Sequence, residues 1–263
     1  MGIKTSMIYG NLPYSVRKKQ VERFLNGETD VIVSTNAIGM GINLPVRRII
    51  FLEDEKFNGR NKEKLSISDV KQIAGRAGRN KETGYVTSTL KSNGFISSKI
   101  NSETPKIKKA YLGFSDEIIS IDAPLADILK VWKTINTPDL FKRMNIDRYI
   151  LLDEKIYLNV SKKDKLKMLT IAFDERNPYL LDLWKQYCFN YELGEKFEPP
   201  TIKGYELNNY EEYYQALDLY YSFSRNFSRE INLEWLNSEK FETSEKINEI
   251  LVKNTMKFDI IDY

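Results

Sequence analysis

The stretch VIVSTNAIGMGINLP, residues 31–45, predicts a buried β-strand that ends in a polar turn with glycines. Its first three residues are β-branched and apolar, which is typical of a strand buried in a parallel sheet. Thr35 follows at the carboxyl end of the strand, where open α/β sheets place their ligands. Gly39 and Gly41 have no side chains, so a nucleotide or another backbone can approach the turn closely. The stretch indicates a ligand-binding sheet edge, with an ordinary strand-to-helix turn as the alternative.

The sequence around this stretch, residues 1–95, alternates short apolar runs with helical patterns. Three further strands are expected, at Met7–Tyr9, Ile49–Leu52 and Gly84–Leu90. One helix is expected to begin at Pro13 and to end near Gly27, and another is expected to begin at the N-cap Ser68. This alternation predicts an α/β domain with a parallel sheet.

After about residue 95 the pattern becomes mostly helical. Helices are expected to begin at Asp122–Pro124, Asn177–Pro178 and Tyr210, and a short strand or two within Tyr149–Val160. Lys196–Lys203, which contains two prolines, is predicted to be a linker. We therefore expect three segments: an α/β domain at 1–95, a helical region at 96–195 and a C-terminal helical domain at 196–263.

The composition excludes several classes of protein and of site. Hydrophobic residues make up 41% and charged residues 29%, as in soluble globular proteins. No apolar run reaches the ~18 residues of a membrane span, and no signal-peptide core is present, so a cytoplasmic location without membrane contact is expected. With no histidine and a single cysteine, Cys188, neither a His-based triad nor a zinc cluster can form, and no metal site is expected. The 40 basic and 37 acidic residues are too balanced to indicate a nucleic-acid partner by themselves.

The second stretch with chemical content is QIAGRAGR, residues 72–79. On a helix, Gln72, Arg76 and Arg79 would fall at i, i+4 and i+7 and point in the same direction. The two glycines between them would each cost about 1 kcal/mol relative to alanine, so close backbone approach is the expected reason for them. A glutamine and two guanidinium groups on one face suit a polyphosphate. The alternative, a solvated basic helix face, does not explain the glycines.

Two other patterns allow both a binding role and an ordinary one. Lys18 and Lys19 belong to a basic helix that either contacts a nucleic-acid backbone or faces solvent. A stripe of tyrosines between Tyr210 and Tyr221 has helical spacing, which favours core packing over base stacking.

A phosphate-cradling loop of the form G-x-x-x-x-G-K-[ST] is absent, because none of the 13 glycines is followed by lysine. Asp54 and Glu55 follow an apolar strand, as the carboxylates of a Mg²⁺ site do. They lie between the two stretches described above, where no Mg²⁺ site is expected, and we interpret them as a solvated strand end.

Together the two stretches resemble motifs V and VI of superfamily two helicases of the DExH-box kind. The pattern STNAIGMGINLPVRRIIF, followed about 20 residues later by QIAGRAGR, is very similar to that of the mitochondrial degradosome RNA helicase family. IYGNLP resembles the motif IV region of that family, and APLADILKVW, FDERNPYLLDLWKQYC and EYYQALDLYYSFSRNF resemble helices of its C-terminal region. The resemblance implies a RecA-like parallel sheet with flanking helices, followed by a mostly α-helical C-terminal region.

The resemblance also implies roles for individual residues. Arg79 would be the arginine finger, Arg76 its companion at the γ-phosphate, and Gln72 a contact to the nucleotide or its attacking water. Asn43 would lie near the ATP ribose or link the two motor domains, and nucleotide contacts are also implied for Gly41, Gly75 and Gly78. Contacts to the RNA backbone are expected from Ser34, Thr35, Gly39, Lys18 and Lys19. Asn36 stands where many relatives have aspartate, so a role that needs a charge is not expected there.

The sequence therefore predicts the C-terminal half of an ATP-dependent RNA helicase. ATP and Mg²⁺ would be shared with a first RecA-like domain that the chain lacks, so the chain alone is expected to be inactive. Single-stranded RNA and that first domain are the expected partners, and an exoribonuclease is a further one. The alternative is a non-catalytic RNA-binding or regulatory module that has kept the fold.

Overall fold

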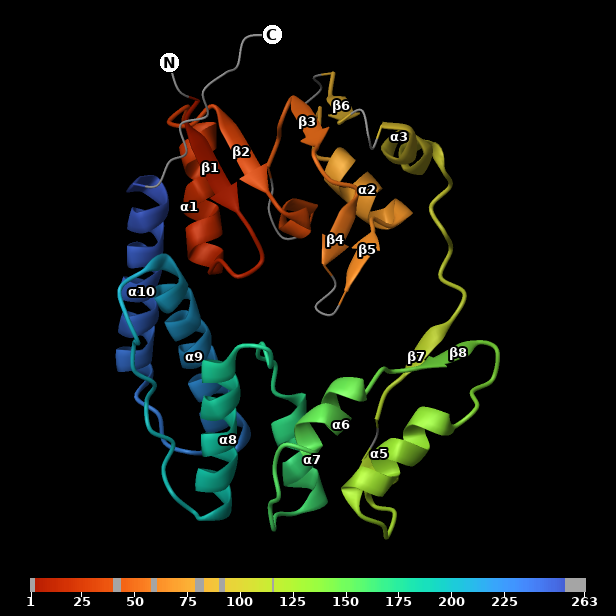
Figure 1. Cartoon of the computed structure of the whole chain (residues 1–263), viewed down its shortest axis with the longest axis vertical. Coiled ribbons are helices and arrows are strands. Elements are labelled where there is room, and N and C mark those ends of the chain that lie inside the picture. Colours follow the sequence, from red (N-terminus) through yellow and green to blue (C-terminus); the bar gives the residue numbers. More distant parts are fainter. Residues whose placement is uncertain are drawn as a thin grey trace. The chain divides into compact units, whose positions relative to one another are not determined.

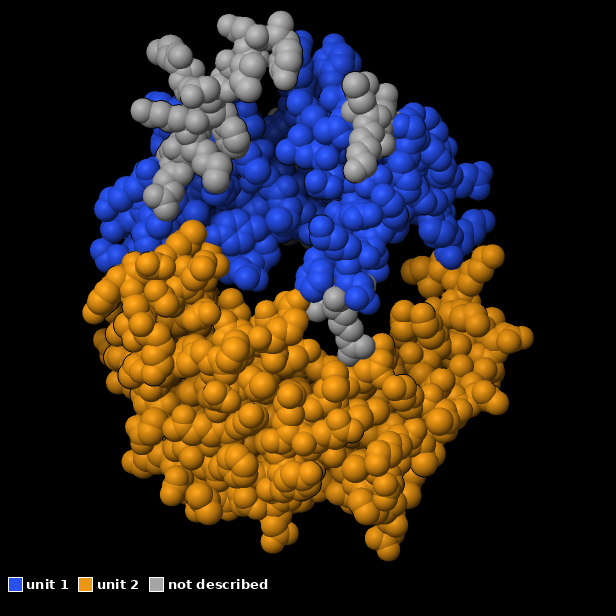
Figure 2. Space-filling view, viewed as in Figure 1, with its two compact units in different colours: residues 1–106, 244–263 blue, residues 107–243 orange. Residues whose placement is uncertain are grey.

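The computed structural model describes residues 3–39, 44–57, 61–78, 83–89, 93–114 and 116–253 of the chain. It divides into two compact units, which Figure 2 colours separately. Unit 1 consists of residues 1–106 and 244–263, and unit 2 of residues 107–243. The three segments expected from the sequence use other boundaries and stay a prediction.

Unit 1 contains two pairs of parallel strands (Figure 1). Strand β1 (Thr5–Ile8) pairs with β2 (Val31–Ser34), and β3 (Arg48–Phe51) pairs with β6 (Tyr85–Ser88). The parallel strands expected from the sequence are confirmed, but their complete burial was wrong. Val31 is 41% exposed and Ile50 is 60% exposed, because each pair buries one face only.

The helices of unit 1 cover these strands. They are α1 (Tyr14–Leu25), the 3₁₀ helix η1 (Asn36–Gly39), α2 (Ile67–Ala74) and α3 (Asn93–Asn101). The last part of a further helix, α10 (Leu233–Lys253), also belongs to unit 1, from residue 244 on. Pro13 is the N-cap of α1, and Gly27 takes a φ of 75° just after its end, as a helix-terminating glycine does. One apolar cluster lies around Ile8 and Val21 and another around Phe51 and Val70, and Ile38 of η1 packs against both. The turn after β2 is thus anchored in the core of the unit.

A β-hairpin between β3 and α2 was not expected from the sequence. Strands β4 (Glu55–Phe57) and β5 (Lys62–Lys64) pair antiparallel. Lys64 Nζ lies 2.9 Å from Asp54 Oδ1 and 3.1 Å from Glu55 Oε1. Asp54 and Glu55 therefore belong to an ion-pair network of the hairpin.

Unit 2 is mostly helical. Its elements are β7 (Ala110–Leu112), α4 (Asp116–Ile119), α5 (Leu125–Thr134), β8 (Phe141–Arg143), α6 (Asp147–Asp153), α7 (Lys162–Thr170), α8 (Pro178–Glu192), α9 (Leu207–Asn226) and the first part of α10 (Leu233–Lys253). Strands β7 and β8 pair in parallel. The strand expected within Tyr149–Val160 was wrong, because α6 extends to Asp153 and buries Leu152.

One large apolar core holds unit 2 together. Trp184 and Tyr187 of α8 and Phe223 of α9 are completely buried in it. Tyr213 and Tyr220 are 7% and 5% exposed, so core packing of the tyrosine stripe is confirmed for these two. The predicted linker forms neither helix nor strand, but its Phe197 is buried in the same core.

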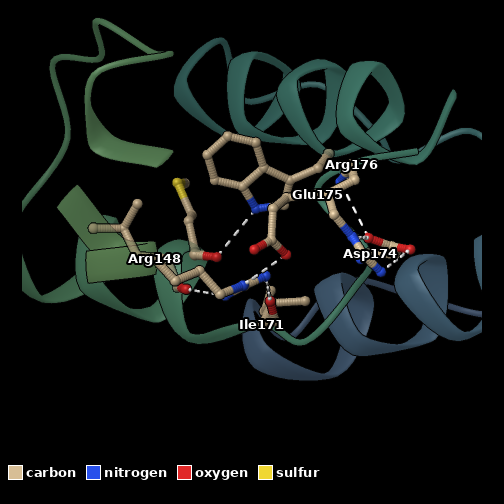
Figure 3. Close-up of polar contacts among 8 residues, drawn as sticks. Arg148, Ile171, Asp174, Glu175 and Arg176 are labelled. Atoms are coloured by element: carbon tan, nitrogen blue, oxygen red, sulfur yellow. Dashed lines mark hydrogen bonds and ion pairs between the residues drawn. The ribbon is translucent and has the colours of Figure 1, made fainter. Parts of the chain in front are cut away.

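Arg148 of α6 binds the end of α7 and the segment between α7 and α8 through its guanidinium group (Figure 3). Its guanidinium donates hydrogen bonds to the carbonyl oxygens of Leu169 and Ile171, at 2.8 and 2.9 Å, and to the carboxylate of Glu175, at 3.2 Å. The same group lies 5.0 Å from the ring centre of Phe173. Each of the three guanidinium nitrogens thus donates a hydrogen bond within unit 2, so we regard Arg148 as structural.

Candidate nucleotide and nucleic-acid site

Helix α2, which carries the first residues of QIAGRAGR, begins at a complete capping box. Ser66 Oγ accepts a hydrogen bond from the amide of Asp69, and the Asp69 carboxylate accepts one from the amide of Ser66. Lys56 of β4 adds an ion pair to Asp69 at 2.8 Å. The expected N-cap, Ser68, was wrong, because this reciprocal pairing moves the start of the helix two residues earlier.

Burial alone would raise the pKa of Asp69, but the hydrogen bonds from Lys56 and Ser66 outweigh it and hold that pKa below its ordinary value of 3.8. The hydrogen bond to Asp69 likewise raises the pKa of Lys56. The start of α2 is therefore tied to the β4–β5 hairpin by two groups that stay charged at neutral pH.

The end of α2 departs from the expected geometry. The helix stops at Ala74, Gly75 is its C-cap, and Arg76 lies in the turn that follows. The expected single helical face was therefore wrong for Gln72 and Arg76, and Arg79 lies outside the described residues. Within the turn, Gly78 adopts a φ of 72°, which residues with a side chain rarely adopt.

That turn brings the two stretches into contact. The Arg76 guanidinium donates a 2.7 Å hydrogen bond to the carbonyl oxygen of Gly39, at the end of η1. Gly39 is buried and lies against Gln72: a Cβ added to Gly39 would be 3.9 Å from Gln72 Oε1. Val46 and Ala77 form an isolated parallel bridge beside this contact. Residues that lie more than 30 positions apart in sequence thus form one site.

Gly84 completes the packing of the turn. A methyl group at Gly84 would lie 2.5 Å from both the carbonyl carbon of Ala77 and the amide nitrogen of Gly78. The backbone before β6 therefore presses directly on the backbone of the turn. This close approach explains why glycine is needed there.

Thr35 lies at the carboxyl end of β2 and is exposed. Its hydroxyl oxygen accepts a 3.4 Å hydrogen bond from the amide of Ala37, and its carbonyl oxygen accepts one from Ile38. Ser34 donates its hydroxyl to the same carbonyl at 2.8 Å. The hydroxyl of Thr35 thus starts η1 and still has a hydrogen to donate to a phosphate oxygen.

The two lysines expected to contact RNA differ in their surroundings. Lys18 is 65% exposed and pairs with Glu22 one helical turn away, at 3.7 Å. Lys19 forms an ion pair with Glu245, in the part of α10 that belongs to unit 1. Next to it, Gln20 donates a 3.0 Å hydrogen bond to Asn248. Lys19 is therefore engaged by the C-terminal helix, and RNA contact by either lysine stays a prediction.

Three expected site residues, Gly41, Asn43 and Arg79, lie outside the described residues. The sequence reasoning missed Asp69 and Gly84 as supports of the site. The pattern Ser66-x-x-Asp69 is a readable capping signal and could have identified the first. Nothing local to Gly84 indicates which backbone it meets.

Comparisons with known proteins identify the families that parts of the chain resemble. Residues 1–81, which include both motif stretches, match the family described as "Helicase conserved C-terminal domain". Residues 207–253 match "ATP-dependent RNA helicase SUV3 C-terminal domain". The chain thus combines a helicase C-terminal domain with a C-terminal domain of the SUV3 type. The fold class expected from the sequence, a RecA-like α/β domain followed by a helical region, is thereby confirmed.

Three relatives illustrate the extent of the SUV3-type match. The chain is 36% identical to ATP-dependent RNA helicase SUV3, mitochondrial, of Candida albicans over 66% of this chain and 26% of that protein. It is 34% identical to the protein of the same name from Oryza sativa, over 70% of this chain and 31% of the relative. ATP-dependent RNA helicase SUPV3L1, mitochondrial, of Gallus gallus is 28% identical over 86% and 32%. The chain thus spans a quarter to a third of the length of these relatives.

The expected cytoplasmic location was wrong, since these SUV3-type relatives are named as mitochondrial proteins. Within the part of the chain that the structure describes, no helix is long and apolar enough to cross a membrane.

Proposed function

We propose that this chain is the C-terminal motor half of an ATP-dependent RNA helicase and that it supplies the arginine finger and contacts to the RNA backbone. The observation that carries the proposal is the hydrogen bond from Arg76 to Gly39, because it joins a phosphate-type arginine motif to a turn at a strand end. Strand ends of α/β sheets are where ligands bind, and helicases of this class close two such domains around ATP.

Different roles follow for the two arginines. Arg76 donates to a main-chain oxygen, so its guanidinium is fixed in direction and couples the arginine motif to the turn that begins with Thr35. Arg79 is the better candidate for stabilising the charge that develops on the transferring phosphoryl group. Gln72, Asn43 and the glycines of both motifs would contact the nucleotide.

RNA would contact the opposite end of the same turn. Thr35 offers an exposed hydroxyl donor at the end of β2, and Ser34 orients the neighbouring carbonyl. Such contacts hold a strand by its phosphates without reading its sequence. Closure of the two motor domains would move this turn and the RNA with it.

ATP would be held by both motor domains, and its Mg²⁺ by the first one, because this sequence contains no phosphate-cradling loop. When bound, Mg²⁺ neutralises charge on the β- and γ-phosphates. The residues of this chain bind and orient the γ-phosphate from the opposite side.

The test is RNA-stimulated phosphate release with the first motor domain supplied in trans or by fusion. The chain alone should give background turnover, and the combination should give RNA-dependent turnover. Arg79→Ala should lower turnover by about 10³ to 10⁵, with RNA affinity retained. Arg48→Ala, which changes an exposed arginine of β3, is the matched control and should leave turnover unchanged.

Normal turnover with Arg79→Ala would contradict the arginine-finger role. RNA binding without any turnover in the combination would instead favour a binding module. The names of the relatives further support a mitochondrial location and an RNA substrate for the whole protein, which cell fractionation and RNA crosslinking would test. An exoribonuclease partner remains part of the proposal, and co-purification from cells would test it.

A further inference from the structure

The two-stranded sheet β7–β8 of unit 2 has one face that does not pack against the core of the unit. The register of β7 and β8 places Tyr111 opposite Lys142, so the two side chains share a face. Lys142 Nζ lies 5.8 Å from the centre of the Tyr111 ring. Lys109, two residues before Tyr111, continues this face by alternation, and Leu140 lies in the turn directly before β8. We call these four residues, Lys109, Tyr111, Leu140 and Lys142, the β7–β8 face.

The opposite side of the sheet serves the fold. Leu112 packs against the core of unit 2. Arg143 donates a 2.5 Å hydrogen bond to the carbonyl oxygen of Trp132. The side of the sheet that carries Leu112 and Arg143 therefore holds the sheet in place, and the β7–β8 face is not needed for packing.

The β7–β8 face is exposed and basic. Tyr111 and Leu140 are both 69% exposed. The segments 104–114 and 140–146 contain four lysines and one arginine and no acidic residue, although Glu103 and Asp139 flank them. Among the described residues, no ion pair is recorded for Lys109 or Lys142. An exposed ring between two lysines that lack acidic partners requires an explanation other than stability.

We propose that the β7–β8 face binds a segment of single-stranded RNA, with one base stacked on Tyr111 and adjacent phosphates paired with Lys109 and Lys142. Single-strand sites combine an aromatic platform with cations along the backbone, and every base offers a π-face to such a platform. The positive charge on both strands favours a polyanion over a protein partner. The inference rests on the proposed function for its RNA substrate and adds a second contact, on unit 2.

The stacking contact is tested with the whole chain and a fluorescently labelled single-stranded oligouridine. Tyr111→Leu keeps an apolar side chain but removes the ring, and it should weaken binding by roughly five- to a hundredfold. Tyr111→Phe should bind as the wild type does. Tyr157→Leu is the matched control, because Tyr157 is 90% exposed elsewhere on unit 2 and should not contribute. Circular dichroism checks that all three variants fold.

The phosphate contacts are tested by the salt dependence of the same binding. Lys109→Ala and Lys142→Ala should each reduce the log–log salt slope by about 0.7. Lys155→Ala is the control, since Lys155 precedes Tyr157 by the same two positions but follows the acidic Asp153 and Glu154. Its slope should equal that of the wild type.

Three results would overturn the inference: unchanged affinity with Tyr111→Leu, unchanged slopes with the lysine variants, or no RNA binding by the wild-type chain. If the β7–β8 face bound a protein instead of RNA, Tyr111→Leu would leave the RNA affinity unchanged, which is the first of these results. The first two leave the proposed function unaffected, because it is measured separately by turnover with the first motor domain. A loss of turnover in Arg79→Ala with normal β7–β8 variants would retain the function and remove this inference alone.

Discussion

Gly84 supports the candidate site through its lack of a side chain. A methyl group there would meet the backbone of Ala77 and Gly78 at 2.5 Å, and backbone cannot move aside as a flexible side chain does. We predict that Gly84→Ala destabilises the chain by about 1–3 kcal/mol, as overpacking does. The displaced turn should also lower RNA-stimulated turnover in the reconstituted helicase.

Gly10→Ala is the control for this prediction, because a Cβ at Gly10 would meet nothing within 4 Å. Urea unfolding gives the stabilities, and turnover is measured under folding conditions. Equal stability of the two alanine variants would show that the turn tolerates displacement.

The capping box at Ser66 makes the stability of α2 depend on pH. The folded-state pKa of Asp69 lies below 3.8, so its contribution is complete above that value and is lost as pH falls through the folded-state pKa. We predict that Asp69→Asn is less stable than the wild type at pH 7 and that this difference disappears in acid. Ser66→Ala should cost about 1 kcal/mol at neutral pH.

Urea unfolding between pH 2 and pH 7 measures the effect. Asp182→Asn, at a side chain that is 76% exposed, should match the wild type throughout. A difference between Asp69→Asn and the wild type that grew in acid would contradict the sign of the pKa shift.

The candidate site residues stand out in the sequence by their types and spacing, but the geometry that brings them together could not be predicted. A short run of glutamine, arginine and glycine indicates phosphate binding, and this indication does not depend on the residue at which the helix ends. The hydrogen bond from Arg76 to Gly39 depends on the turn at Gly78 and on the close approach of the Gly84 backbone to that turn. Both are set by backbone conformation.

At the scale of elements, the packing of α10 on α1 is the contact with the clearest energetic consequence. Gln20 is 1% exposed, and its amide nitrogen donates to Asn248. Removing the acceptor leaves a buried donor without its partner, which costs about 1–3 kcal/mol. We predict that Asn248→Ala destabilises unit 1 by that amount and speeds hydrogen exchange in α1.

Glu249→Ala, one position further, removes a half-exposed partner of Lys246 and should change stability by less than about 0.5 kcal/mol. Exchange in α1 that is the same for both variants would mean that α10 does not stabilise that helix.

Elements with strong local signals could be predicted, and those without them could not. Asn177 caps α8 with Pro178 in its first turn, as its sequence indicates. The strand β5 reads Lys-Glu-Lys and has no apolar residue, so only pairing with β4 makes it a strand. Helix α6 was mistaken for a strand because it is only seven residues long and its apolar run begins with the β-forming types Tyr149 and Ile150.

At the scale of the molecule, the single cysteine provides a test of unit 2 alone. Cys188 is completely buried, and burial raises the pKa of its thiol. We predict that it does not react with a thiol reagent in the native chain and that labelling follows the opening of unit 2. Rapid labelling in the absence of denaturant would contradict the packing around α8.

The overall plan could be predicted because the α/β and helical halves have different periodicities. The assignment of residues 244–253 to unit 1 could not. It depends on contacts such as that between Gln20 and Asn248, 228 residues apart, for which a sequence carries no local pattern.

This last feature has a consequence for how the chain is made. Unit 2 is one continuous segment, whereas unit 1 combines residues from both ends of the sequence. On a ribosome, α1 emerges early, but Glu245 and Asn248 follow only after about 220 further residues have been translated. Unit 1 therefore cannot complete its packing until the last part of α10 has been made. Unit 2 needs no residue beyond Thr243 to fold. A released chain that ends at Thr243 should therefore have a protease-sensitive α1 and a protected unit 2.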